Sequence, residues 1–264
     1  MIDTHAHVNF EAFNGDYPEV IRRSFDNGVE KIINVGSNFL TSQRAIKIAK
    51  EFGGCYAALG LHPIHADEEK FHLSDYRNLL KGDGDTIKAI GETGLDYYRS
   101  PKDAPIIVEQ RQLFLQHLVL AQESDLPIIL HCRGDKNQPF NAYEDLLSII
   151  RSRPRAPRGV IHCFVADWAI AQKFLDLGFY IGFTGIITYA NVGEDLMEVI
   201  RRMPLNLILA ETDSPYLAPE LMRRQRCEPW HVKYTIEKIA AIKNLTFSEV
   251  EKQTSQNARQ LFNL

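Results

Sequence analysis

Short apolar runs rich in β-branched residues alternate along the chain with longer segments of helical period. Short buried strands that alternate with amphipathic helices predict βαβ units and a parallel sheet. The strand pattern fits Ile2–His5, Val29–Gly36, Cys55–Leu61, Thr86–Gly91, Pro127–Cys132, Gly159–Cys163, Phe179–Gly182 and Leu207–Glu211. Helices are predicted at Tyr17–Asn27, Thr41–Phe52, Ser74–Leu80, Val108–Ser124, Tyr143–Arg151, Trp168–Leu177, Glu194–Arg202, Trp230–Lys243 and Ser248–Leu261.

This alternation predicts an α/β fold of the TIM type, a (β/α)8 barrel formed by one domain over residues 1–264. The alternative is a doubly wound open sheet, which has fewer strands and a glycine-rich phosphate-binding turn after the first. Here the first strand leads into His-Ala-His-Val-Asn, without that turn. No internal repeat, low-complexity segment or linker divides the chain.

Composition narrows the class of protein further. The 264 residues carry a formal net charge of −4, which argues against a protein that coats long duplexes through a broad basic surface. A nucleic-acid enzyme with a focused cationic site stays open, because a bound metal brings its own positive charge. The four cysteines are scattered, so no disulfide framework is expected and a reduced, cytoplasmic setting fits. No leader, membrane span or obligate protein partner is evident from the sequence.

One basic run, Ser152–Arg158, suggests contact with nucleic acid. It falls between a predicted helix and the next strand, and hence on the N-terminal face of a barrel. Active sites lie at the opposite face, so we interpret this run as an ordinary solvated loop.

Metal-capable side chains follow most of the predicted strands, at the end of a barrel where active sites form. The set is His5, His7, His62, Glu92, His131, His162 and Asp213. Since residues i and i+2 of a strand share a face, His5 and His7 present two imidazoles side by side. The same alternation predicts that Cys132 and Cys163 point outward, beneath the helices, as small buried hydrophobes. Glu211 shares a face with Asp213, and either orients a ligand or pairs with a neighbouring arginine.

Imidazole and carboxylate donors suit Zn, Mn, Mg or Fe. Four histidines and two carboxylates of this set, six ligands in all, exceed what one catalytic ion with an open position needs. They suffice for two ions that share a bridging carboxylate, an arrangement that activates water in phosphoryl transfer with the ions about 4 Å apart.

Taken together, the motifs of the chain resemble the TatD family of metal-dependent deoxyribonucleases. The resemblance covers essentially the whole chain and rests on Asp3–His7, Gly60–Pro63, Gly91–Tyr98, Pro127–His131, His162–Phe164, Gly178–Gly182, Glu211–Pro219 and Asn257–Phe262. It implies an amidohydrolase-like barrel with two divalent ions. The implied activity is hydrolysis of DNA phosphodiesters, as a 3′-to-5′ exonuclease that prefers single-stranded ends, with RNA open as a further substrate.

The resemblance also implies roles for single residues. His5, His7 and Asp213 look like the ligands of one ion, His131 and His162 look like those of the second, and Glu92 looks like the bridge. Our mechanistic hypothesis is that two ions (Mg, Mn or Zn) activate a water molecule that Asp213 orients and deprotonates.

The resemblance offers substrate contacts as well. His62, Tyr97 and Arg133 are candidates because they adjoin the motif residues. For Tyr97 and Arg133, packing or a surface ion pair is an equally open interpretation.

One segment departs from the family pattern. Many members carry an Arg-Gly-Lys-x-Asn-Glu-Pro-like segment after the last strand, where residues 223–229 read Arg-Arg-Gln-Arg-Cys-Glu-Pro. Because Arg224 stands in place of the glycine, we expect the loop to take another path. Its three arginines are candidates for phosphate contacts, Arg223 first among them. This departure and the acidic pI leave room for a small-molecule amide, ester or lactone hydrolase on the same centre. A further alternative is a non-catalytic metal-binding scaffold, against which the six filled ligand positions argue.

Overall fold

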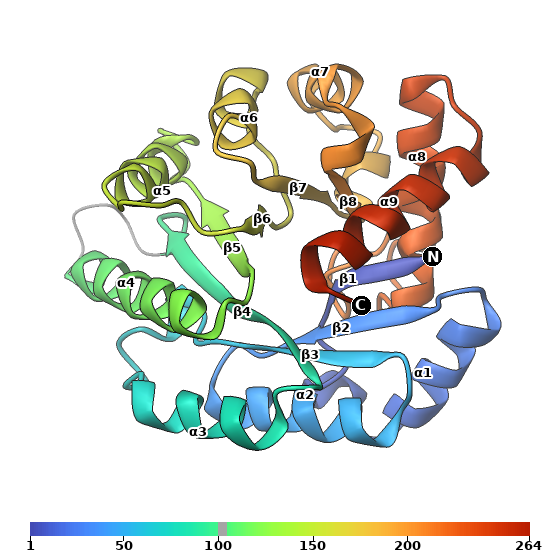
Figure 1. The fold of residues 1–264 in the computed structure, drawn as a ribbon. Coiled ribbons are helices and arrows are strands. Elements are labelled where there is room, and N and C mark those ends of the chain that lie inside the picture. The colour runs from blue at the N-terminus through green and yellow to red at the C-terminus, as the bar shows by residue number, and fades with distance from the viewer. Residues whose placement is uncertain (100–104) are drawn as a thin grey trace.

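The computed structural model describes residues 1–99 and 105–264. Its strands are β1 (Ile2–Ala6), β2 (Lys31–Val35), β3 (Cys55–Leu59), β4 (Ile87–Asp96), β5 (Ile128–Arg133), β6 (Gly159–Ile161), β7 (Tyr180–Phe183) and β8 (Ile208–Ala210). The helices are α1 (Tyr17–Asp26), α2 (Phe39–Glu51), α3 (Leu73–Asp83), α4 (Ile106–Ser124), α5 (Asn141–Arg151), α6 (Trp168–Leu175), α7 (Glu194–Arg202), α8 (Val232–Lys243) and α9 (Phe247–Phe262). The strands pair in parallel in the order β1 to β8, and the helices surround them (Figure 1).

The barrel closes between β1 and the segment that follows β8. The Asp213 amide donates to the His5 carbonyl at 2.8 Å, and the His7 amide donates to the Ser214 carbonyl at 2.8 Å. Ala6 and Ser214 thereby form a parallel bridge. The predicted (β/α)8 barrel is confirmed, and its closing bonds join the two segments that carry His5, His7 and Asp213.

One apolar layer fills the barrel interior. Its strand residues are Ile2, Ile33, Val35, Ala58, Ala89, Ile129, Val160, Tyr180 and Leu209. Ala258, Leu261 and Phe262 of α9 join this layer, so α9 covers the end of the barrel where the strands begin (Figure 1). The Asn257 amide group holds α9 there by donating to the carbonyls of Leu205 and Ile208, both at 2.8 Å.

The same layer explains which side chains reach the opposite end, the mouth of the barrel. Side chains alternate along a strand, so two residues beyond an inward position the chain faces inward again. Two residues after Ile129, Val160 and Leu209 come His131, His162 and Glu211. The apolar interior therefore gives way to ionisable groups at the mouth.

The fourth strand is longer than the sequence predicts. The predicted end at Gly91 is wrong, because β4 continues to Asp96 after a register shift against β5 between Ile90 and Thr93. Gly91 and Gly94 adopt φ of +141° and +142°, and a Cβ on Gly94 would lie 2.0 Å from the His131 carbonyl oxygen. These glycines allow an irregular strand rather than ending it, and Glu92 lies inside the irregular stretch.

Strands β2, β3, β6 and β8 are shorter than predicted, and two of them matter for the site. The structure ends β6 at Ile161 and β8 at Ala210, so His162, Glu211 and Asp213 lie in the loops just beyond them. Cys163 is one residue further and has a φ of +46°, so strand alternation does not fix its direction.

Cys163 corrects one prediction. Its Sγ lies 3.5 Å from Thr184 Oγ1. Thr184 directly follows the end of β7, so this contact places the thiol beside the mouth instead of beneath the helices. Burial first, and then the charge of Asp213, raise the pKa of this thiol. The outward placement is confirmed for Cys132, which is buried in the core between sheet and helices.

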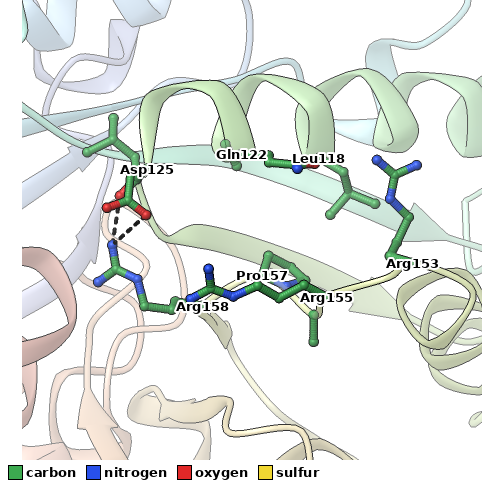
Figure 2. A pocket seen from close by; sticks show the side chains of 10 residues that line it. Leu118, Gln122, Asp125, Arg153, Arg155, Pro157 and Arg158 are labelled. Atoms are coloured by element: carbon green, nitrogen blue, oxygen red, sulfur yellow. Dashed lines mark hydrogen bonds and ion pairs between the residues drawn. The ribbon is translucent and has the colours of Figure 1, made fainter.

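The basic loop Ser152–Arg158 precedes β6 and lies away from the mouth. It lines a cavity of about 120 Å³ against the last turns of α4, as Figure 2 shows. The Arg158 guanidinium donates to the Asp125 carbonyl at 2.7 Å and lies 3.7 Å from the Asp125 carboxylate. The structure therefore agrees with the interpretation of a loop outside the active site.

Helix α4 supports the mouth from outside with two buried polar side chains. Gln110 accepts the Asp96 amide at 3.0 Å, and His117 Nε2 accepts the Leu61 amide at 3.0 Å. These bonds fix the ends of β4 and of the loop after β3. In the described parts of the chain, no helix has the length and apolar content needed to cross a bilayer.

Candidate metal centre

The two histidines of the first motif converge at the mouth. Their Nε2 atoms lie 3.2 Å apart, and both rings are buried. His7 Nδ1 lies 2.8 Å from the Val35 carbonyl, which can only accept, so His7 carries its proton on Nδ1 and turns a lone pair on Nε2 inward. That nitrogen faces Asp213 Oδ1 at 3.3 Å, where it meets another acceptor. A cation between them satisfies both, so this donor set fits a divalent ion.

Glu92 faces two separate groups of histidines with its two oxygens. Oε2 lies 3.3 Å from His5 Nε2 and 3.8 Å from His7 Nε2. Oε1 lies 2.8 Å from His131 Nδ1 and 3.5 Å from His62 Nε2. Donor atoms of His5, His7 and Glu92 lie within 4.8 Å of one another, as do those of His62, Glu92 and His131. One carboxylate thus belongs to two candidate ion sites.

The second group includes an acidic residue to which the sequence interpretation gave no role. His131 Nε2 lies 3.1 Å from Asp96 Oδ2. Burial alone would lower the pKa of His131, but hydrogen bonds to Asp96 and Glu92 raise it to about 9. In contrast, burial and the His131 charge lower the pKa of His62 to about 4, so its neutral ring is ready to act as a ligand. The geometry groups His62, previously a candidate substrate contact, with His131.

His162 lies between the two groups. Its ring stacks on His5 with centroids 3.5 Å apart, and its Nε2 lies 3.7 Å from Asp213 and 3.9 Å from Glu92. Glu211 holds the other side of the ring, with Oε1 2.7 Å from Nδ1. Burial would lower the pKa of His162, but Glu211 and then Glu92 raise it to about 10. Of the two roles open for Glu211, the structure favours orienting a histidine.

Glu211 fits here because its neighbour in β7 has no side chain. A Cβ on Gly182 would lie 2.5 Å from Glu211 Oε2. Glu211 Oε1 also accepts the Cys163 amide at 2.6 Å. The glycine therefore makes room for a carboxylate that fixes both His162 and the loop after β6.

Asp213, like His131, is only partly buried among the predicted ligands, and its backbone is held in place by Asp3. It has a φ of +59° and is partly exposed toward the mouth. Asp3 accepts the Thr212 amide at 2.9 Å and the Thr212 hydroxyl at 2.6 Å. Burial alone would raise the pKa of Asp213, but its contact with His7 and the His162 charge lower it. Asp213 is therefore an ionised carboxylate that faces solvent across the centre.

The predicted substrate contacts separate in the structure. Tyr97 is fully buried, and its hydroxyl donates to Asp145 at 2.8 Å, which agrees with the packing interpretation and leaves no surface for substrate. Arg133 ends β5 at the mouth, with its guanidinium carbon 3.7 Å from the centroid of the Tyr98 ring. Arg223 lies further out, 4.4 Å over the ring of Tyr189.

The segment 223–229 corrects one expectation. Arg224 adopts a φ of +78°, a conformation that glycine takes readily, and the different backbone path expected for this loop stays a prediction. Arg226 is occupied: it donates to the Asp16 carboxylate at 2.9 and 2.5 Å and lies over Phe13. It fastens the loop to α1 and is not free to bind phosphate.

Comparisons with known proteins agree over the whole chain. A family model described as TatD related DNase matches residues 2–263. The Bacillus subtilis protein named uncharacterized metal-dependent hydrolase YabD is 37% identical, over 100% of this chain and 99% of its own length. The 3'-5' ssDNA/RNA exonuclease TatD of Erwinia tasmaniensis is 33% identical over 100% of both. The crystal structure of YJJV, a TatD homologue from Escherichia coli, superposes with a TM-score of 0.88 at 30% identity, covering 100% of this chain and 98% of that one.

Proposed function

The chain belongs to the TatD-related DNase family, and from that premise we propose that it is a metal-dependent phosphodiesterase. It removes nucleotides from the 3′ end of single-stranded DNA and also accepts RNA. The centre holds two divalent ions, Mg, Mn or Zn. His5, His7 and Asp213 would hold one, His131 and His162 together with His62 would hold the second, and Glu92 would serve both.

The observation that carries the proposal is the position of the Glu92 carboxylate. One oxygen lies 3.3 Å from His5 and the other lies 2.8 Å from His131. A buried carboxylate between two nitrogen groups is the donor arrangement of a two-ion hydrolytic site. When bound, the ions supply Lewis-acid chemistry by lowering the pKa of water and neutralising charge on phosphoryl oxygens.

The residues around the centre orient the water, hold the ligands and bind the phosphate. Asp213 is ionised and partly exposed, so it orients the attacking water and accepts its proton. Glu211 and Asp96 hold the rings of His162 and His131, so the ligands keep their direction when a strand binds. Arg133 at the end of β5 supplies a fixed positive charge for a phosphate.

The test is digestion of one single-stranded oligonucleotide labelled at either end, with Mg²⁺ or Mn²⁺. We expect mononucleotide to be released at once from the 3′-labelled strand, and shortened ladders from the 5′-labelled one. Glu92→Ala and Asp213→Ala should lose activity, while Tyr56→Ala, at the opposite end of the barrel, should keep it. Full activity in the Glu92 and Asp213 variants, or turnover only of ester or lactone substrates, would contradict the proposal.

A further inference from the structure

Two exposed tyrosines stand at the mouth of the barrel. Among residues 1–99 and 105–264, Tyr98 and Tyr216 are the tyrosines among the exposed large hydrophobic side chains, at 41% and 55% exposure. Tyr98 follows the end of β4 by two residues, and Tyr216 follows Asp213 by three. Exposed rings beside a catalytic centre leave apolar area in contact with water, which is unfavourable until a ligand covers them.

Tyr216 borders the candidate metal centre. Its amide donates to the Asp213 carbonyl at 2.9 Å, which ties the ring to the segment of that ligand. The strands of the barrel are all parallel, so the loops after β4 and β8 leave it at the same end, and Tyr98 and Tyr216 both lie at the mouth.

Two cationic side chains lie over the ring of Tyr98. The guanidinium carbon of Arg133 lies 3.7 Å from the ring centroid, and Lys136 Nζ lies 5.2 Å from it. Both cations are within the distance of a cation–π contact. Arg133 ends β5, two residues after His131, so this cluster adjoins the second candidate ion site.

A single strand needs such contacts on this protein. The net charge of −4 argues against binding through a broad basic surface, so stacking and a few focused cations are the contacts left to hold a strand. Aromatic rings stack on any unpaired base, whereas the bases of a duplex are stacked on each other and offer no free face. Tyrosine rings at the mouth therefore select unpaired ends.

We propose that Tyr216 and Tyr98 form a two-base stacking platform. Tyr216 stacks on the base of the terminal nucleotide, and Tyr98 with Arg133 and Lys136 takes the next nucleotide. The charges decide which tyrosine takes which nucleotide. The only phosphate of the terminal nucleotide is the one that is cleaved at the centre. Arg133 and Lys136 therefore bind a phosphate of the nucleotides that follow it in the strand. This inference rests on the proposed function and adds how the substrate is held.

The test combines ring removal with base removal. A ten-nucleotide single strand is compared with the same strand lacking its 3′-terminal base or its penultimate base. For the wild-type protein, kcat/KM should fall about tenfold with each missing base. Tyr216→Ala should lose about tenfold on the intact strand and nothing more when the terminal base is absent. Tyr98→Ala should show the same pattern for the penultimate base.

Controls separate stacking from structure. Tyr216→Phe and Tyr98→Phe keep the ring and should keep the dependence of kcat/KM on the corresponding base, which the alanine variants lose. Tyr56 lies beneath Lys31 and Lys88, with Nζ atoms 5.0 and 5.6 Å from its ring, so Tyr56→Ala removes a similar pair remote from the mouth and should change nothing.

Failure of the platform is distinguishable from failure of the proposed function. Equal kcat/KM for intact and base-free strands, or equal losses in Tyr216→Ala on both, overturns the platform while phosphodiesterase activity stands. Absence of cleavage with Mg²⁺ or Mn²⁺ refutes the proposed function instead. Fluorescence anisotropy of the same labelled strands then decides the platform, since equal affinity for intact and base-free strands overturns it.

Discussion

His117 is a buried histidine whose neutral form the fold requires. Its ring is fully enclosed, with Nε2 accepting the Leu61 amide at 3.0 Å and Nδ1 donating to the Leu113 carbonyl at 2.9 Å. Protonation would turn Nε2 into a donor and break the bond to Leu61, next to His62. Burial lowers the pKa of His117 from 6.5 to about 4, and the bond to Leu113 offsets this only in part.

The sign of the effect on stability follows from proton uptake. Between pH 6.5 and about 4, the unfolded chain binds a proton at this position and the folded chain does not. The contribution of His117 to the free energy of unfolding is therefore complete above pH 6.5 and is lost as the pH falls toward 4. The full loss is about 3 kcal/mol, at about 1.4 kcal/mol per pKa unit. About 2 kcal/mol of it falls between about pH 7.5 and about pH 5.

The assay is urea unfolding of the wild-type protein and of His117→Gln at these two pH values, both without metal. Glutamine does not titrate, so the free energy of unfolding of the wild type should fall by about 2 kcal/mol more than that of the variant. His131 and His162 titrate in both proteins, and their effects cancel in this difference. Tyr76→Phe, which removes a neighbouring bond to the Gly60 carbonyl, should lower stability equally at both pH values. An equal fall in wild type and His117→Gln would refute the reasoning.

Three further predictions follow from single positions. Gly182→Ala places a Cβ 2.5 Å from Glu211 Oε2, so metal affinity should fall at least about tenfold. Circular dichroism checks that the variant is folded. Unchanged affinity would show that Glu211 does not position a ligand. Arg224→Gly relieves a φ of +78° and should raise the free energy of unfolding in urea by about 1 kcal/mol, whereas a loss would mean that the side chain stabilises the loop. Metal binding near neutral pH should release protons, because the pKa values of His131 and His162 are raised to about 9 and about 10. Calorimetry in two buffers of different ionisation enthalpy measures this, and zero release would show that these histidines are neutral before metal binds.

The barrel could be predicted because short apolar runs alternate along the chain with segments whose apolar residues have a helical period. Inward positions such as Ile129 and Val160 continue to His131 and His162 by alternation, so the ring of ionisable groups follows from the strands themselves. The end of β4 could not be predicted in this way. Gly91 and Gly94 resemble a turn in sequence, whereas in the fold they let the backbone approach β5.

The candidate ligands were accessible to sequence reasoning, but the groups that hold them were not. Asp96 is 35 residues from His131, and Asp3 is 209 residues from Thr212, and nothing local in the sequence pairs them. The only local signal for Asp3 was its place two residues before His5. For Arg226 the prediction itself was wrong. A basic residue near the mouth was expected to contact phosphate, but Arg226 binds Asp16 at the start of α1.

The central claim is that Glu92 belongs to two ion sites at once, and metal content tests it most directly. The wild-type protein, loaded with Mn²⁺ and desalted, is compared with Glu92→Gln by elemental mass spectrometry. We expect two ions per chain in the wild type and at most one in the variant, because the amide cannot bridge two cations. A single ion in the wild type, or two ions retained by Glu92→Gln, would contradict the account.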